Sequence, residues 1–394
     1  MEQNPSEIVV IQFYDTSTET TSQSFQVPVK IRRTQLLELL DRKSTLYYSG
    51  HIITNDLLSV LPKNFNREET IVIKTSDEKE QKAAVYCSSS FSGHESAVLA
   101  VACDGNDVFT VGGDATVRKW DFDMKLQKKI SKEHTHWIQV VKILNNMVFT
   151  GGMDAQVCVF DKDLNLLCTI RGHSNGITGI GEIEEMIVTS SRDKTVRFWQ
   201  KKDKNEKIEY ECVYTYAHDG IVNGIYVHNS RIYSYSKDSS VKIYEKMRYV
   251  TEIKTNSSIN TLKAHEKDVY IGCEDGSVYK NNSVIAKQNN LISSIDVSQN
   301  GIYFATGSFS KKTCVYTTDG DLIAEYMHFD SVYKVKMVSY MVYSSSKDKT
   351  IKIFSLKTKK VVSTLICKDE VYDFDLHGEK VVAACKDGRV YFFE

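Results

Sequence analysis

Short runs of apolar and β-branched residues alternate with polar turns along most of the chain, a pattern typical of β-strands. Four of these runs, which read MVFTGG, MIVTSS, RIYSYS and MVYSSS, begin at residues 147, 186, 231 and 341. Each leads into the motif x-x-D-x-x-[VI]-x-x-[WFY], in which a turn aspartate is followed six residues later by an aromatic residue. The pattern therefore predicts a repeated β-structure.

The motif occurs eight times along the chain. Its turn position falls at residues 114, 154, 193, 238, 275, 310, 348 and 387, and all of these except Ser310 are aspartates. Successive copies lie 35 to 45 residues apart, close to the length of one four-stranded blade of a β-propeller. We therefore predict a mainly β protein in which eight WD-type repeats form an eight-bladed propeller.

Five histidines fix the register, because each lies 20 residues before a motif aspartate and has a threonine or serine 16 residues after it. Buried polar groups need partners, so we expect these residues to form a hydrogen-bond network within each blade. The predicted structural network consists of His94, Asp114, Trp120, His134, Asp154, His173, Asp193, Trp199, His218, Asp238, His328, Asp348 and Asp387. The regular spacing indicates a scaffold and not catalytic dyads. His134 and His136 have no further ligands clustered near them, so the sequence does not predict a metal site there.

Repeats five, six and eight depart from this pattern. Thr255, Gln288 and Cys367 stand near the histidine position in these repeats. Repeat five also has Asn281 where the closing aromatic residue should be. We therefore expect the fold to hold, while the sequence leaves the regularity of blades five and six open.

The chain ends inside its last repeat. The final residues, VYFFE, follow the pattern of a third strand, so the outer strand of the last blade must come from elsewhere. The run at 83–87 (AAVYC), just before the first repeat, is predicted to supply it. Such pairing closes the ring and removes exposed sheet edges.

The segment before the repeats has a different pattern. Strand patterns at 7–14 and 24–31, a helical pattern at 35–40, and strand patterns at 46–48 and 70–74 give the order β-β-α-β-β, typical of a ubiquitin-like domain. The charged stretch that follows (SDEKEQK) predicts a solvated, mobile linker. The predicted organisation is a ubiquitin-like α+β domain at 1–75, a linker at 76–82 and a propeller at 83–394.

Composition narrows the classes of function. The formal net charge of −1 gives no overall positive field for nucleic acid, so any RNA contact must come from a local patch. Nine single cysteines without C-x-x-C spacing argue against a disulfide framework or zinc site and fit a reducing compartment. The chain has no recognisable secretory signal, membrane-spanning run or catalytic motif. We therefore expect neither a membrane protein nor an enzyme.

A ubiquitin-like domain followed by eight WD repeats resembles the Notchless family of large-ribosomal-subunit assembly factors. The local resemblance is carried by SSSFSGHESAVLAVA at 88–102, HTHWIQVV at 134–141, FDSVYKV at 329–335 and KDEVYDFD at 368–375. The linker lacks the basic, proline-containing run common in relatives, which puts any contact made there in doubt. The resemblance implies a nuclear and nucleolar protein that is monomeric outside the precursor particle.

The family also implies a mechanism. The ubiquitin-like domain docks on the AAA ATPase midasin and supplies a carboxylate to a Mg²⁺ ion that midasin holds, while the propeller binds the precursor large ribosomal subunit. ATP-driven force then remodels the particle. The residue that matches the carboxylate here is Glu68, with Glu69 as the alternative, and Mg²⁺ prefers such hard oxygen ligands. No cofactor of the protein's own and no metal bound by the chain alone is implied.

The residue before the turn aspartate is basic in four repeats, and equivalent positions in a propeller lie on one face near the channel rim. A candidate interaction face, for rRNA or an acidic protein, consists of Trp137, Arg192, Lys237, Lys347 and Lys386. The alternative is that these are ordinary solvated side chains.

Two other interpretations stay open. A seven-repeat midasin-binding relative shares the front domain and is distinguished by the number of repeats. A WD-repeat substrate receptor of a ubiquitin ligase would explain the propeller but not the particular repeat openings. An enzyme would need a motif such as G-x-x-x-x-G-K-[ST] or H-E-x-x-H, which the sequence lacks.

Overall fold

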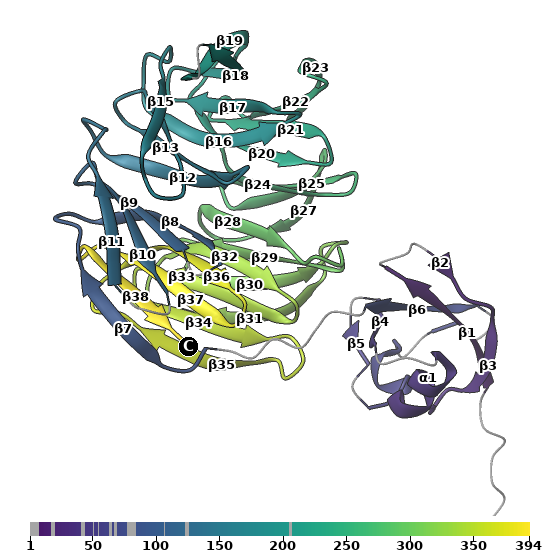
Figure 1. Cartoon of the computed structure of the whole chain (residues 1–394). Helices are drawn as coiled ribbons and strands as arrows, with labels where there is room; N and C mark the ends of the chain where they lie inside the picture. Colours follow the sequence, from purple (N-terminus) through teal and green to yellow (C-terminus); the bar gives the residue numbers. More distant parts are fainter. Residues whose placement is uncertain are drawn as a thin grey trace, which may run out of the picture.

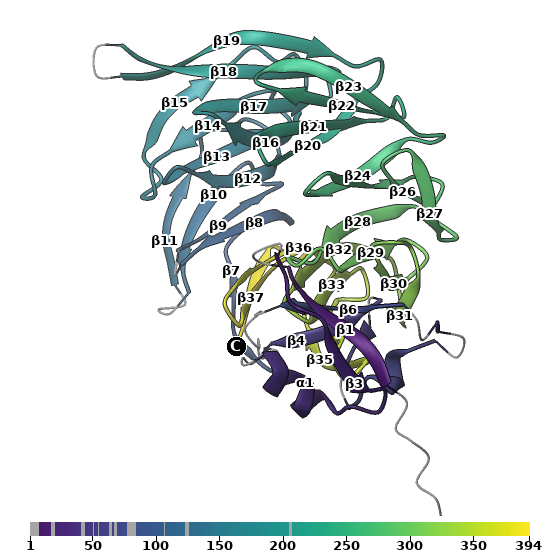
Figure 2. The same cartoon turned by 90° about the vertical axis from the view of Figure 1, so that its right-hand side faces the viewer.

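The computed structural model describes residues 8–16, 20–40, 44–49, 51–53, 55–62, 65–66, 69–76, 84–105, 107–122, 126–204 and 207–394. These residues form a small N-terminal domain and a ring of β-sheets that lies beside it (Figures 1 and 2). The end of the chain lies at the edge of the ring, next to strand β7.

The N-terminal domain packs one helix against a mixed sheet. It comprises β1 (Ile8–Asp15), β2 (Thr20–Thr21), β3 (Phe25–Pro28), α1 (Arg33–Leu40), β4 (Thr45–Tyr48), β5 (His51–Ile52), the 3-10 turn Leu58–Val60 and β6 (Ile71–Ser76). The strand order is β2-β1-β6-β4-β5, with β3 beside β1 and β1 parallel to β6. Because side chains alternate along β1, Val9, Ile11 and Phe13 point into the core that contains Leu36 of the helix.

Eight four-stranded antiparallel sheets form the ring, and the first strands of neighbouring sheets lie side by side around it. Blades one to four contain β8 (Val98–Asp104), β9 (Asp107–Gly112), β10 (Val117–Asp121), β11 (Leu126–Ser131); β12 (Ile138–Leu144), β13 (Met147–Gly152), β14 (Val157–Phe160), β15 (Leu166–Ile170); β16 (Ile177–Ile183), β17 (Met186–Ser191), β18 (Thr195–Lys204), β19 (Lys207–Ala217); and β20 (Val222–His228), β21 (Arg231–Ser236), β22 (Ser240–Glu245), β23 (Arg248–Lys254).

Blades five to eight complete the ring. They contain β24 (Ile259–His265), β25 (Asp268–Cys273), β26 (Ser277–Lys280), β27 (Ser283–Lys287); β28 (Ile292–Val297), β29 (Tyr303–Ser308), β30 (Lys312–Thr317), β31 (Leu322–Met327); β32 (Val332–Val338), β33 (Met341–Ser346), β34 (Thr350–Ser355), β35 (Lys360–Ile366); and β36 (Val371–His377), β37 (Lys380–Cys385), β38 (Arg389–Phe393), β7 (Cys87–Ser92). The predicted eight-bladed propeller is confirmed.

Strand β7 closes the ring by pairing antiparallel with β38 in the eighth sheet. The sequence predicted that 83–87 supplies this strand, and it identified the blade correctly. The predicted bounds were wrong, because the paired strand runs over Cys87–Ser92; residue 83 lies outside the described residues. Phe91 accounts for the later register. Its ring packs against Trp120 of blade one and Phe392 of blade eight, with ring centroids 6.2 and 6.0 Å away.

One hydrogen bond recurs in all eight blades on the same face of the ring. The residue before the motif's turn position donates its backbone N–H to the carbonyl of the residue that precedes the blade's first strand, at 2.7–3.0 Å. We call this face, formed by those loops and turns, the upper face. In chain order the donors are Gly113, Met153, Arg192, Lys237, Glu274, Phe309, Lys347 and Lys386.

Blade three shows the predicted side-chain network. Trp199 Nε1–H donates to Thr189 Oγ1 (2.8 Å), the Thr189 hydroxyl contacts His173 Nε2 (2.7 Å), and His173 Nδ1 contacts the Asp193 carboxylate (2.7 Å). Burial alone would raise the pKa of Asp193, but hydrogen bonds from Thr195 and His173 outweigh it and hold the pKa at about 2. Burial lowers the pKa of His173 against the opposing effect of Asp193, so the network holds a neutral imidazole that donates to a carboxylate.

The other four histidines make the same two contacts at 2.7–2.9 Å: His94 with Asp114 and Thr110, His134 with Asp154 and Thr150, His218 with Asp238 and Ser234, and His328 with Asp348 and Ser344. All four histidines are buried. Each network joins the loop before a blade to the blade's second strand and its following turn.

Blades without the histidine use other groups. In blades five and eight a tyrosine four residues after the aspartate takes over: Tyr279 OH accepts the N–H of Asn256 (3.2 Å), and Tyr391 OH accepts that of Lys368 (3.1 Å). In blade six the Gln288 side-chain amide donates to a strand threonine (2.6 Å). Blades five and six form complete four-stranded sheets, which answers the question of their regularity that the sequence left open.

The network predicts unequal costs for two similar substitutions. Asp193→Ala should lower the free energy of unfolding by about 1–3 kcal/mol, the usual cost of leaving buried partners unsatisfied. Asp275→Ala should cost less, because the Asp275 side chain is 38% exposed and its blade has no histidine, whereas that of Asp193 is 4% exposed. Thermal unfolding of both variants beside the wild type measures the difference. Equal losses would contradict the role given to the network.

Candidate interaction face

The four predicted basic residues lie at equivalent positions on the upper face, but their surroundings differ. Lys386 Nζ lies 2.8 Å from Glu370 Oε1, and Lys347 Nζ lies 3.7 Å from Asp330 Oδ2. Burial would raise the pKa of Glu370, yet the hydrogen bond from Lys386 is among the interactions that lower it. Lys347 and Lys386 therefore each face a carboxylate of the same blade.

Arg192 and Lys237, on blades three and four, keep their charge available. Both side chains are exposed, and within the part of the chain that the structure describes neither forms an ion pair with a carboxylate. They line a hollow of about 330 Å³ with residues that begin the first strands of blades two to five. The hollow lies at the upper mouth of the central channel.

Side-chain amides around this mouth also tie the blades together. Gln139 Nε2 donates to the carbonyl of Ile177 in blade three (2.6 Å), and Asn223 Nδ2 donates to that of Ile259 in blade five (2.7 Å). The equivalent amide of Asn260 is buried and has no partner among the described residues. Two cations and several amide donors line the mouth, and its lining contains no carboxylate, so it suits an anionic group.

The channel behind the mouth carries further charge. Three of its lysines pair with aspartates of the next blade: Lys263 with Asp296 (3.2 Å), Lys334 with Asp373 (2.5 Å) and Lys336 with Asp375 (2.6 Å). Lys142, in the first strand of blade two, forms no such pair within the described ranges. Burial lowers the pKa of Lys142, as do Lys334 and Lys263. Most of the lysine charge in the channel is therefore balanced by aspartates, and burial disfavours the charged form of Lys142.

Exposed aromatic rings stand on the same face. Trp137, predicted for this surface, is 57% exposed, and its carbonyl accepts the recurrent hydrogen bond in blade two. Phe329 is 85% exposed and directly follows the network histidine of blade seven. Sequence reasoning missed Phe329 as a surface residue. The sequence did contain a sign of this exposure: the residue that follows the network histidine is polar in the other repeats, for example Glu95 and Thr135.

The predicted partner-metal ligand lies elsewhere, in the N-terminal domain. Glu68 falls outside the described residues. The alternative, Glu69, is exposed just before β6, and its Oε1 accepts a hydrogen bond from Asn66 Nδ2 (3.1 Å). Glu69 is therefore tied to its own loop.

The upper face is the candidate site that the described residues present. Among them, no cluster of three or more histidine, cysteine or acidic side chains is arranged to hold a metal ion. In the same part of the chain, no helix has the length and apolar character needed to span a membrane. Exposed cations, amide donors and aromatic rings on one face can bind a partner that carries carboxylates or phosphates.

Comparison with known proteins agrees with the fold. The WD40 family (WD domain, G-beta repeat) matches residues 85–121 and 164–200, so the chain carries WD40 repeats. The Sqt1 protein of Saccharomyces cerevisiae aligns with a TM-score of 0.71 at 15% identity, over 79% of this chain and 99% of that one. Sqt1 of Chaetomium thermophilum, bound to the N-terminus of the ribosomal protein L10, also aligns with a TM-score of 0.71, at 17% identity, over 78% and 99%.

Curated relatives match shorter segments. Pre-mRNA-processing factor 19 of Oryza sativa subsp. japonica is 34% identical over 106 residues, which is 25% of this chain and 20% of that protein. The ribosome biogenesis protein WDR12 homolog of Trichoplax adhaerens is 26% identical over 118 residues, 28% of this chain and 27% of that protein. The chain spans between 20% and 34% of the length of the first curated relatives that it matches.

Proposed function

We propose that this protein is a non-enzymatic assembly factor of the large ribosomal subunit, of the Notchless type. In this proposal the upper face of the propeller binds the precursor particle in the nucleus and nucleolus. The N-terminal domain acts as a ubiquitin-like module that docks on the midasin ATPase. The observation that carries the proposal is an eight-bladed WD-repeat ring joined to a small domain of six strands and one helix. The upper mouth of this ring has two cations without carboxylate partners among the described residues.

The relatives support a ribosomal setting. One curated relative is a ribosome biogenesis protein, and a propeller of similar fold binds the N-terminus of a ribosomal protein. Relatives in pre-mRNA processing also fit a nuclear location. Eight sheets, in place of seven, argue against the seven-repeat midasin-binding alternative. A ubiquitin-ligase substrate receptor would leave the N-terminal domain without a role.

The upper face suits the chemistry of such a particle. Arg192 and Lys237 would meet phosphates of rRNA or acidic segments of particle proteins, since exposed cations favour both. The exposed rings of Trp137 and Phe329 offer apolar surface beside them, and aromatic residues are enriched where protein partners bind. The protein would act as a monomer until it binds the particle.

Charge reversal at the mouth tests the particle contact. Arg192→Glu with Lys237→Glu should reduce co-sedimentation of the full chain with precursor large subunits by about tenfold or more, because it removes two unpaired cations and adds two anions. Lys347→Glu with Lys386→Glu is the matched control and should reduce it less, since both lysines already face carboxylates. Unchanged binding by the first variant would contradict the proposed contact.

The midasin contact has its own test. The proposal keeps Glu68 as the ligand of the partner-held Mg²⁺, because Glu69 is bonded to Asn66. Glu68→Ala or Glu68→Gln should nearly abolish Mg²⁺-dependent binding of the full chain to the midasin adhesion domain, since a neutral group is a poor ligand for a hard dication. Glu68→Asp should weaken the binding, and a chelator should mimic Glu68→Ala. Binding that survives the chelator would contradict the Mg²⁺-dependent mechanism. Loss of binding in Glu69→Ala but not in Glu68→Ala would show that Glu69 is the ligand.

A further inference from the structure

Tyr47 of the N-terminal domain is buried against the propeller. Its side chain is only 1% exposed. The ring lies 5.9 Å from that of Tyr303 in an edge-on arrangement and 6.5 Å from that of Tyr340, measured between centroids. Its hydroxyl accepts a hydrogen bond from Asn300 Nδ2 (3.2 Å). One tyrosine thus makes both apolar and polar contacts with a separate domain.

Neighbouring groups extend this contact. Thr45, two residues earlier on β4, accepts a hydrogen bond from the hydroxyl of Tyr340 and is itself buried. Ile52 of β5 packs at the edge of the same apolar cluster, which includes Leu356 of blade seven. Strands β4 and β5 therefore present one continuous surface to blades six and seven.

The contact does not belong to the core of the N-terminal domain. Leu46 and Tyr48 pack with that core, whereas Tyr47 points the opposite way, as alternation along a strand requires. A domain free on its linker would expose the Tyr47 ring to water. The propeller residues of the cluster therefore account for most of the burial of Tyr47.

The receiving surface lies on the face opposite the upper face. Asn300 precedes β29 in the turn after β28, Tyr340 lies in the turn between β32 and β33, and Leu356 lies in the turn after β34. These turns join first to second strands and third to fourth strands, whereas the upper face contains the turns between second and third strands. We call this opposite side the lower face. The N-terminal domain thus leaves the Arg192 and Lys237 mouth uncovered.

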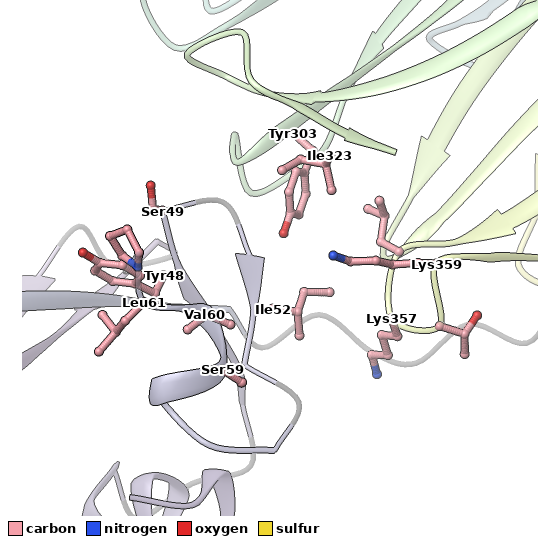
Figure 3. Close-up of a pocket in the computed structure, with 13 residues that line it drawn as sticks. Tyr48, Ser49, Ile52, Ser59, Val60, Leu61, Tyr303, Ile323, Lys357 and Lys359 are labelled. Carbon is pink, nitrogen blue, oxygen red and sulfur yellow. The ribbon is translucent and has the colours of Figure 1, made fainter. Parts of the chain in front are cut away.

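The two surfaces do not close completely. A cleft of about 640 Å³ remains beside Ile52, between Val60 and Leu61 on one side and Ile323 on the other (Figure 3). The side chains of Lys357 and Lys359 border the same cleft from the propeller. A contact that has one buried tyrosine and a neighbouring open cleft is small, so it can release without unfolding either domain.

We propose that the lower face at blades six and seven is a receptor for the N-terminal domain of the same chain, with Tyr47 as the residue that anchors it releasably. In the docked state the two domains move as one body, although a charged linker joins them.

Nuclear magnetic relaxation of the full chain tests the docking without any partner. In the wild type, backbone amides of residues 8–76 should show the same transverse relaxation rates as those of the propeller. In Tyr47→Ala they should relax about fivefold more slowly, as expected for a small domain that tumbles alone. Propeller rates should stay close to their wild-type values.

Two further variants make the result specific. Tyr14→Ala is the matched control. Tyr14 and Tyr47 both pair with Lys74, from opposite sides of β6, so they lie on the same face of the sheet. The N-terminal domain of this variant should relax at the wild-type rates. Tyr340→Ala removes the contact from the propeller side and should release the domain even if Tyr47→Ala does not fold. Independent tumbling of the wild-type domain, or slow tumbling in both contact variants, would overturn the proposal while leaving the proposed function untouched.

Discussion

The pairing of β7 with β38 is the constraint on which the rest of the structure depends. A strand from before the first repeat completes the last blade, so the ring has no open sheet edge at its seam. Asp373 and Asp375 of blade eight reinforce the seam by accepting backbone N–H groups of Val101 and Cys103 in blade one (3.0 and 2.9 Å). Closure fixes the eight blades around one channel and therefore defines two faces with separate chemistry.

The upper face is built from a repeated polar frame that tolerates exchange of its parts. A backbone hydrogen bond between turn and loop is present in every blade, whereas the side-chain network varies among histidine, tyrosine and glutamine. Because this hydrogen bond holds each turn in place, the neighbouring side chains can differ from blade to blade without loss of the fold. Arg192 and Lys237 occupy such positions at blades three and four, and Phe329 occupies one at blade seven.

The sequence predicted the repeated part of the structure well, because spacing reports local geometry. The eight turn positions gave the blade count, and the 20-residue spacing paired each histidine with its aspartate. Contacts between distant segments were harder. The position of β7 depends on Phe91 meeting Trp120. Tyr279 and Tyr391 share a spacing of four residues from the motif aspartate, and the sequence interpretation did not use it.

The candidate site shows the same division. The sequence placed the basic residues on one face, but it could not show that Lys347 and Lys386 face carboxylates while Arg192 does not. The charged segment after the front domain predicted a solvated, mobile linker, and it gave no sign that Tyr47 would be buried by turns about 250 to 300 residues away. Such contacts arise from tertiary packing, which hydrophobic periodicity within one strand does not encode.

The central claim is that the upper face binds the precursor particle while the lower face holds the N-terminal domain. Lysine modification of the full chain, free and bound to purified precursor large subunits, followed by mass spectrometry, tests this claim most directly. The account predicts that Lys237 becomes protected in the complex and that Lys359, exposed beside the lower-face cleft, stays reactive. Protection of Lys359 with Lys237 still reactive would contradict it.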